Sequence, residues 1–275
     1  GLVGSEMCIR DRYLDIMDHR KTEQLIDTLD KVEQNRKECY IREFSIEHFH
    51  DSKVFETLIP KICKIFREEN EELTGFENEE ILAEYQIYKT PGYVYMKGNV
   101  QIYSAGKQAA DISAFPEGIA VAVGSEEDVP DICPDQTIDK VFTIENLTSF
   151  YRFKQEHSLV IYLGGYHNRS RRNLLMQIYQ KLPDAQYYHF GDLDAGGFYI
   201  LEHLKRKTGI PFQMFQMDIE TLKKYEDYAK PLTENDKKRL MQLEKMELPD
   251  EERKLITYML QKGIKLEQEC ISESQ

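Results

Sequence analysis

The chain has 275 residues, 41% hydrophobic and 31% charged, a composition typical of one large or two small globular domains and not of a disordered chain. Its longest apolar runs, such as IAVAV at 119–123, are far shorter than the ~20 residues that cross a bilayer. No basic-then-apolar leader opens the chain, so we expect a soluble, intracellular protein. A net charge of −13 argues against an ordinary nucleic-acid-binding protein, since such proteins usually carry a basic surface.

The negative charge is confined to the front of the chain. Residues 1–140 carry all of it, whereas residues 141–275 carry no net charge. Residues 111–139 alone hold eight carboxylates and neither Lys nor Arg. Such acidic stretches are most often solvated loops or helix faces, so the charge argument against nucleic-acid binding weakens for the rear half. The five cysteines are scattered without a C-x-x-C pair and support neither a disulfide framework nor a zinc knuckle.

Residues 1–12, GLVGSEMCIRDR, form a segment that we interpret as non-native. The segment begins without Met and shows no hydrophobic period of either kind. It resembles the translation of an adaptor sequence joined to a truncated gene, and we therefore leave it out of the fold prediction. On this interpretation the natural protein extends further upstream.

Residues 13–110 are predicted to form a helical module that ends in a β-ribbon. Apolar residues recur at helical spacing within 25–32 and 54–65, and a third, short helix is expected after Asn78. Tyrosines and aliphatics then alternate around Pro91-Gly92 and Gly98-Asn99, a pattern of hairpin strands. Helices followed by a hairpin suit a winged-helix-like module. The tyrosines more often serve cross-strand packing than stacking on nucleic acid.

After an acidic, proline-bearing connector at 111–139, the pattern from 140 to 275 alternates strands with helices. We expect strands at 140–145, 158–165, 186–192 and 211–217, and helices at 147–156, 168–181, 196–207, after Asp218, from about Thr233 and over 250–262. Strands that alternate with helices of this length indicate βα crossovers and a parallel sheet. The near-continuous apolarity of the strands agrees, because both faces of a parallel sheet are covered. The predicted fold class is therefore α/β, a parallel sheet flanked by helices.

Three carboxylates stand where these strands end. Glu145 ends the first strand, and Asp192 and Asp194 follow the third in the sequence GDLDAGG. Open parallel sheets bind ligands outside the carboxyl ends of their strands, so the three side chains can converge on one crevice. An isolated D-x-D more often caps a turn, but the glutamate one strand away and the Gly164-Gly165 pair at the end of the intervening strand favour a functional site.

Convergent carboxylates at one sheet edge suit a divalent cation. Without a counter-charge they repel one another and their pKa values rise. A hard cation removes that conflict, and oxygen ligands favour Mg²⁺, with Mn²⁺ as its substitute. Gly196 and Gly197 let the backbone turn tightly from the aspartates into the following helix. His189, within the third strand, is more typical of a packed core histidine than of a ligand.

The blocks of this half resemble a known family. A strand that ends in Glu (VFTIEN), a Gly-Gly pair and HFGDLDAGG resemble a Toprim domain, the metal-binding module of topoisomerases, primases and certain nucleases. IENLTSF, GDLDAGGFYIL and KLEQE near the end are more similar to the C-terminal region of JetD proteins, the nuclease subunits of Wadjet plasmid-defence systems and relatives of the topoisomerase VI A subunit. The resemblance is strong over about 140–270 and faint over 50–110, and it implies a Toprim domain at 140–275.

The resemblance implies metal-dependent cleavage of DNA in the cytoplasm of a bacterium or archaeon. Asp192 and Asp194 would hold Mg²⁺ or Mn²⁺, while Glu145 would bind metal or move protons. JetD-like proteins are expected to hydrolyse plasmid DNA, to act as homodimers and to work with a condensin-like Wadjet complex that presents circular DNA. Glu267 and Glu269, in the KLEQE block, are expected to make capping or surface contacts.

DNA phosphates would be contacted by a basic segment after the Gly164-Gly165 pair. Between residues 151 and 181, six Lys or Arg face one Glu. The strand end and helix start hold the candidates His167, Arg169, Arg171 and Arg172, where backbone N–H groups and the helix dipole already favour phosphate. The simpler alternative is a solvated basic helix face.

Two other classes of function stay open at this point. A topoisomerase VI A-like enzyme would attack DNA with a tyrosine, for which Tyr93, Tyr95 and Tyr103 are the candidates, and would remain covalently attached. A non-catalytic module would bind DNA or partners without cleavage, although the intact Glu145, Asp192 and Asp194 argue against it. A receiver-like domain also places acids at strand ends, but its usual Lys and Thr positions are not evident.

Overall fold

The computed structural model describes residues 19–70, 73, 76–89, 92–104, 106–123, 130–164 and 169–271. Residues 1–12, interpreted above as non-native, lie outside these ranges. The chain divides into two compact units, residues 1–91 and 92–275. This boundary differs from the predicted ones at 110 and 139, because the tyrosine-rich stretch expected in the front module pairs instead with strands of the rear unit.

Unit 1 is mainly helical, as its apolar periodicity indicates. Its elements are α2 (His19–Gln34), β1 (Cys39–Tyr40), α3 (Ile41–Phe49), α4 (Val54–Glu69), α5 (Asn78–Glu84) and β2 (Ile87–Tyr88). Leu29, Ile62 and Ile65, which recur at the predicted helical spacing, are fully or almost fully buried. The two short strands pair in parallel, Cys39 with Ile87 and Tyr40 with Tyr88.

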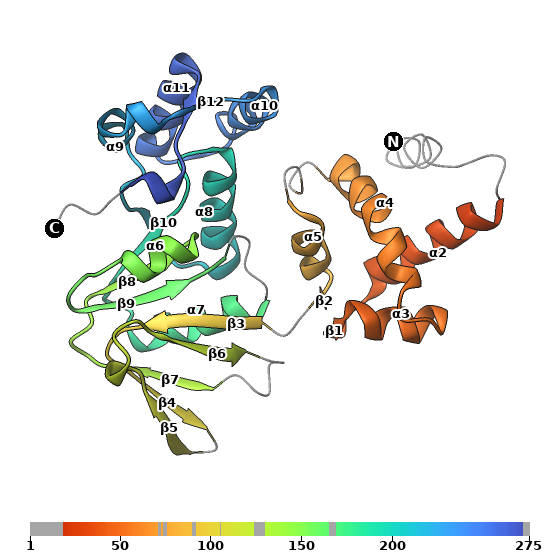
Figure 1. Ribbon diagram of the computed structural model, residues 1–275, viewed down its shortest axis with the longest axis horizontal. Helices are drawn as coiled ribbons and strands as arrows, with labels where there is room; N and C mark the ends of the chain where they lie inside the picture. The colour runs from red at the N-terminus through yellow and green to blue at the C-terminus, as the bar shows by residue number, and fades with distance from the viewer. Residues whose placement is uncertain are drawn as a thin grey trace. The chain divides into compact units, whose positions relative to one another are not determined.

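Unit 2 holds the alternating strands and helices that the sequence predicts (Figure 1). Its front part contains β3 (Gly92–Lys97), β4 (Val100–Ser104), β5 (Lys107–Asp111), η2 (Ile112–Ala114), β6 (Ile119–Val123) and β7 (Asp131–Pro134). The alternating part contains β8 (Lys140–Ile144), α6 (Leu147–Arg152), β9 (Ser158–Tyr162), α7 (Arg169–Lys181), β10 (Gln186–Phe190), α8 (Ala195–Thr208), β11 (Gln213–Met214) and α9 (Ile219–Lys224). The end of the chain contains η3 (Glu226–Tyr228), β12 (Lys230–Pro231), α10 (Glu234–Leu243), α11 (Asp250–Lys262), β13 (Ile264–Lys265) and η4 (Gln268–Cys270).

The central sheet of unit 2 has six strands in the order β11-β10-β8-β9-β3-β6. The four strands from β11 to β9 are parallel, as predicted, which brings the carboxyl ends of β8, β9 and β10 to one edge. β3 and β6 extend the sheet in the antiparallel sense. The fold is therefore α/β with a mixed sheet, and β8, which Glu145 directly follows, lies in its interior between β10 and β9.

Two predictions for the front of unit 2 are wrong. The expected hairpin around Gly98-Asn99 does not form, because β3 pairs within the central sheet while β4 pairs with β5 and β7 in a separate three-stranded sheet. Gly98 makes this exit possible, since its φ is +138° and a Cβ there would lie 2.6 Å from the Ser158 carbonyl oxygen. The described residues of the expected connector at 111–139 include β6 and β7, which pair in the two sheets.

Each face of the central sheet has its own core. Successive residues of β8 alternate between them, so that Val141 packs with α7 on one face while Phe142 packs with α6 and the C-terminal helices on the other. The helix signals in the sequence are also placed as predicted, since Asp218 and Thr233 cap α9 and α10 and Gly263 ends α11 in the left-handed conformation. In the described part of the chain, no helix has both the length and the apolar character needed to cross a membrane.

Candidate active site

The ends of β8 and β10 bring Glu145 and Asp192 next to each other. Glu145 directly follows β8, and its backbone N–H donates to the Phe190 carbonyl at 3.0 Å. The backbone N–H of Asp192 in turn donates to Oε2 of Glu145 at 3.2 Å. Gly191 allows this approach, because a Cβ at that position would lie 2.6 Å from Glu145 Oε2 and 2.8 Å from His189 Nε2. The parallel register thus places the two predicted acids at one point of the sheet edge.

Asp194 is held by the helix that follows it. It is the N-cap of α8, and its Oδ1 accepts the Gly197 N–H at 2.9 Å. The sequence alternative for the D-x-D pattern, capping of a turn by Asp, is therefore part of what Asp194 does. Gly197 is needed there because a Cβ would lie 2.2 Å from the Asp192 carbonyl oxygen. The first turn of α8 consequently packs directly on the backbone of the other aspartate.

The C-terminal segment completes this edge of the sheet. Leu266 pairs with Leu193 in an antiparallel bridge, and the backbone N–H of Gln268 donates to Oδ1 of Asp192 at 2.6 Å. Nearby, Glu269 accepts the Asn146 side-chain N–H at 2.6 Å, while Glu267 pairs with Lys230 at 2.5 Å. The predicted surface contacts of Glu267 and Glu269 are confirmed. Sequence reasoning missed Gln268, because no periodic signal marks a residue whose partners lie more than 70 positions earlier.

Asp192 is a carboxylate of this edge whose pKa is shifted by its surroundings. Burial raises the pKa of Asp192 to about 6, the Gln268 N–H opposes that rise, and the negative charges of Asp194, Glu269 and Glu267 add to it. His189 is fully buried, its Nδ1 lies 3.0 Å from the Thr143 hydroxyl, and burial lowers the pKa of its imidazole to about 3. It is the core histidine that the sequence predicts.

The comparisons with known proteins give the family. A family model described as the C-terminal part of the Wadjet protein JetD matches residues 127–275, more than half of the chain. The chain belongs to the JetD family. It is also 28% identical over 263 residues to the Wadjet protein JetD of Bacillus cereus (strain Q1), an alignment that covers 94% of this chain and 63% of that protein. The JetD-family chain therefore spans less than two thirds of the length of this curated relative.

A divalent cation fits the donor chemistry of this JetD-family edge, although the carboxylates do not form a closed cage. Among the residues that the structure describes, no three His, Cys, Asp or Glu side chains are close enough to surround a metal ion. The carboxylates nevertheless offer oxygen donors, and Asp192 is disfavoured as an anion by burial and by further carboxylates. Mg²⁺ commonly binds one or two protein carboxylates and completes its shell with water and phosphate. Asp192 and Asp194 are the side chains that suit this role.

The predicted phosphate contacts of the JetD-family chain are only partly described. Gly165, His167 and the side chain of Arg169 lie outside the described residues. Arg171, at the start of α7, donates to the carbonyls of Leu163 and Tyr93, so its guanidinium joins the ends of β9 and β3. Burial lowers the pKa of Arg171. Arg172 lies on the same helix turn and is half-buried. At least part of the basic segment therefore stabilises the fold, through the hydrogen bonds of Arg171.

Tyrosines near the acidic edge lie on β3 and β9. Tyr93 is half-exposed on β3, while Tyr95 packs edge-on against Tyr162 of β9 with ring centroids 5.7 Å apart. Tyr103 lies on β4, in the other sheet. Burial raises the pKa of Tyr162, Arg171 opposes the rise, and the charge of Glu145 adds to it. Tyr162, which the sequence did not single out, is thus a tyrosine whose pKa is raised in part by the charge of Glu145. Gly164, at φ +67°, lies against its ring.

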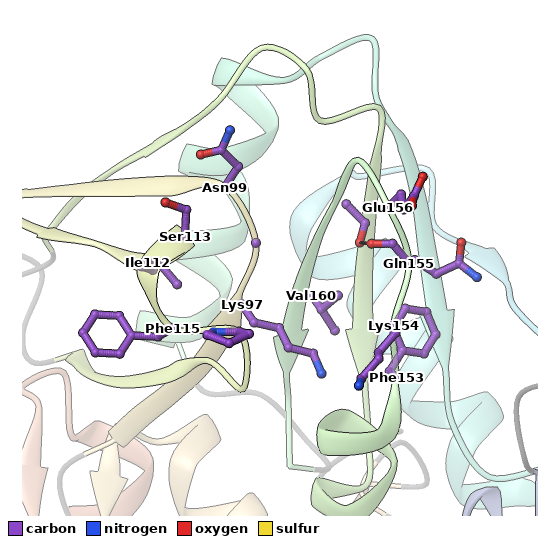
Figure 2. Close-up of a pocket in the computed structure, with 13 residues that line it drawn as sticks. Lys97, Asn99, Ile112, Ser113, Phe115, Phe153, Lys154, Gln155, Glu156 and Val160 are labelled. Carbon is purple, nitrogen blue, oxygen red and sulfur yellow. Dashed lines mark hydrogen bonds between the residues drawn. The ribbon is translucent and has the colours of Figure 1, made fainter. Parts of the chain in front are cut away.

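A pocket of about 560 Å³ lies at the opposite end of β9 from Gly164 (Figure 2). Figure 2 shows the Lys97 side chain extending across it toward Phe153 and Lys154. The Lys97 ammonium donates to the carbonyls of Phe150 at 2.6 Å and Tyr151 at 3.3 Å, at the C-terminal end of α6. Because Asn146 caps the beginning of the same helix, both ends of α6 are fixed, and with them the backbone that follows Glu145.

Proposed function

We propose that this chain carries the catalytic part of a divalent-metal-dependent DNA endonuclease of a Wadjet plasmid-defence system. The observation that supports it best is the placement of Asp192, a half-buried carboxylate whose pKa is raised by burial and by the charges of further carboxylates at the edge where the parallel strands end. Membership of the JetD family supports the defence-system role. A bound divalent cation would neutralise charge on the scissile phosphate and lower the pKa of an attacking water.

The residues of the chain take distinct roles in this proposal. Asp192 and Asp194 supply oxygen ligands, and each already has one carboxylate oxygen fixed by a backbone N–H. Glu145, the neighbour of Asp192, either adds a ligand or accepts a proton from water. Attack by water is favoured over attack by tyrosine, because Tyr103 lies in the other sheet and the ring of Tyr95 packs against Tyr162.

The proposed partners rest on the family resemblance and on the charge distribution. The chain as a whole is acidic, and the net charge of residues 141–275 is zero, so the protein should bind free DNA weakly. We propose that a condensin-like Wadjet complex delivers circular DNA to a homodimer of JetD chains. The isolated chain should then be almost inactive on plasmid DNA, and addition of the complex should restore cleavage.

The test is cleavage of supercoiled plasmid by the full chain with its Wadjet partners and Mg²⁺. Asp192→Asn and Asp194→Asn should each reduce the rate by at least about 100-fold. Glu252→Gln is the matched control, because it neutralises a carboxylate on α11 that pairs with Lys205, and it should leave the rate unchanged. Wild-type rates in Asp192→Asn would contradict the proposed role of the carboxylates.

The chemistry of the cut ends separates the alternatives. Hydrolysis leaves free ends, whereas a tyrosine transesterase leaves protein attached to DNA after denaturation. Extraction of the cut plasmid with detergent and phenol should therefore leave all product in the aqueous phase. Product that moves to the protein interface would instead identify the topoisomerase VI A-like alternative. Complete absence of cleavage by the assembled wild-type system would favour a non-catalytic module.

A further inference from the structure

Gln268 is a polar residue with no exposed surface, and both its side chain and its backbone N–H form hydrogen bonds at the candidate active site. Its side-chain Oε1 accepts the backbone N–H of Asn146 at 2.8 Å. Its Nε2 donates to the Phe190 carbonyl at 2.9 Å, and its own backbone N–H donates to Asp192 Oδ1 at 2.6 Å. A buried amide is expected to satisfy both its donor and its acceptor, and Gln268 does so on two different strands.

The side chain of Gln268 joins the two strand ends that carry the acids. Asn146 follows Glu145 at the end of β8, and Phe190 is the last residue of β10, two positions before Asp192. Only a side chain with a donor and an acceptor at this reach can bond both strands. Asn would be one methylene too short, and a carboxylate would lack the donor that the Phe190 carbonyl receives.

This anchoring fixes the backbone N–H that holds Asp192. The Leu193–Leu266 bridge fixes the C-terminal segment at residue 266, two positions before Gln268. The backbone N–H of Gln268 itself is held in place by the hydrogen bonds of the Gln268 side chain. The hydrogen bond from that amide engages one of the two carboxylate oxygens of Asp192. It thereby restricts rotation of the carboxylate while the second oxygen keeps its lone pairs for a ligand.

We propose that Gln268 is a positioning residue that orients the Asp192 carboxylate toward a divalent cation. The proposal rests on the proposed function, because it assigns a partner to a ligand of that same site. Residues that orient metal ligands typically change metal affinity by 10–100-fold when they are replaced. The effect should appear in the affinity for the cation itself, before any DNA is bound.

The experiment measures Mn²⁺ binding to the full chain by the electron paramagnetic resonance signal of the free ion. Gln268→Met keeps the length and flexibility of the side chain but removes both of its hydrogen bonds, and it should weaken Mn²⁺ binding by at least about tenfold. Gln177→Met is the matched control, because the Gln177 side chain accepts the Ile132 N–H at 3.0 Å, away from the acids. It should leave the affinity within about twofold of wild type, by the usual size of surface effects.

A variant that fails to fold does not end the test. Gln268→Asn keeps the amide with a shorter reach, and it carries the measurement if thermal unfolding shows that Gln268→Met is not folded. Mn²⁺ affinity in the folded Gln268 variant equal to that of wild type would overturn the positioning role. So would an equal loss in Gln177→Met, since it would indicate general destabilisation.

Asp192→Asn distinguishes failure of this proposal from failure of the proposed function. If Asp192→Asn abolishes Mn²⁺ binding while the Gln268 variants bind as wild type does, only the positioning role falls. If Asp192→Asn binds Mn²⁺ as tightly as wild type, Asp192 is not a metal ligand and both proposals fall. Weaker binding in Asp192→Asn and in the Gln268 variants, with Gln177→Met unchanged, is the result that we expect.

Discussion

Two groups of carboxylates lie near opposite ends of helix α8, and they differ in what compensates their charge. Asp192 and Asp194 precede the helix, where the groups that act on Asp192 are a backbone N–H and further carboxylates. Glu202, in the second half of the helix, lies 2.8 Å from the Lys205 ammonium, which also pairs directly with Glu252 of α11. Glu202 and Glu252 thus share the Lys205 ammonium as their cation. The groups that shift the pKa of Asp192 include no such cation.

The comparison shows why a shifted pKa alone does not identify a functional site. Burial raises the pKa of Glu252 to about 7, Lys205 opposes the rise, and Glu202 adds to it. The shift at Asp192, to about 6, has the same sign and the same first cause. What separates them is the ammonium of Lys205, which makes one group a structural ion-pair network and leaves the other suited to an external cation.

The largest effect that breaks this comparison should come from Lys205→Met. It removes the ammonium and leaves the buried Glu252 beside Glu202, and loss of one partner of a buried pair costs about 3–5 kcal/mol. The free energy of unfolding from urea titration should therefore fall by about that amount. Mn²⁺ affinity of the folded fraction should stay at the wild-type level. A loss of less than about 1 kcal/mol would show that solvent, and not Lys205, compensates the negative charges of Glu202 and Glu252.

The next effect separates two neighbouring glycines at the beginning of α8. A Cβ at 197 would lie 2.2 Å from the backbone carbonyl of Asp192, whereas a Cβ at 196 would lie 3.1 Å from the side chain of Asp194. Gly197→Ala should therefore destabilise unit 2 by about 1–3 kcal/mol and weaken Mn²⁺ binding. Gly196→Ala should stay close to wild type in stability, because Ala favours helix. Equal thermal unfolding of the two variants would contradict this reading of the turn.

Much of the rear fold could be predicted from the sequence, because its signals are local. Strand-length apolar runs, the Asp218 and Thr233 caps and the terminal Gly263 each act within a few residues. The stretch around Gly98-Asn99, which does not form the predicted hairpin, has the same alternation of apolar and polar residues as a hairpin. Alternation reports a half-buried strand but not its partner, and β3 pairs with β9, more than 60 residues later.

The candidate site was predictable to the extent that it depends on strand order. Parallel strands bring Glu145 and Asp192 to one edge whatever the details of packing. The interior role of Arg171 depends on carbonyls of two other strands, and the position of Gln268 depends on where the C-terminal segment returns to the sheet. Neither leaves a periodic trace, so only the structure could assign them.

Asp192→Asn should trade function for stability. The amide oxygen can still accept the Gln268 N–H, while the half-buried charge and its repulsion by Asp194 are removed. At pH 8 the variant should be more stable than wild type by about 1–2 kcal/mol, the usual sign at a site shaped for function. Since the pKa of Asp192 is raised, the wild-type deficit should shrink as the pH falls through about 6. A variant less stable than wild type at pH 8 would contradict the proposed electrostatic cost of the Asp192 charge.

The smallest effect tests whether Glu252, which pairs with Lys205, titrates with a raised pKa. A raised pKa in the folded state means that the folded protein binds a proton more tightly than the unfolded chain. The contribution of Glu252 to stability is then fully present below its unfolded pKa, near 4.5, and is lost as the pH rises through about 7. Glu252→Gln removes this dependence, so the difference in melting temperature between the variant and wild type should change by about 2–4 °C between pH 5 and pH 8, in favour of the variant at pH 8. A constant difference over that range would mean that Lys205 keeps Glu252 ionised from pH 5 to pH 8. Glu252 and Asp192 would then differ in proton binding as well as in whether a cation of the fold pairs with them.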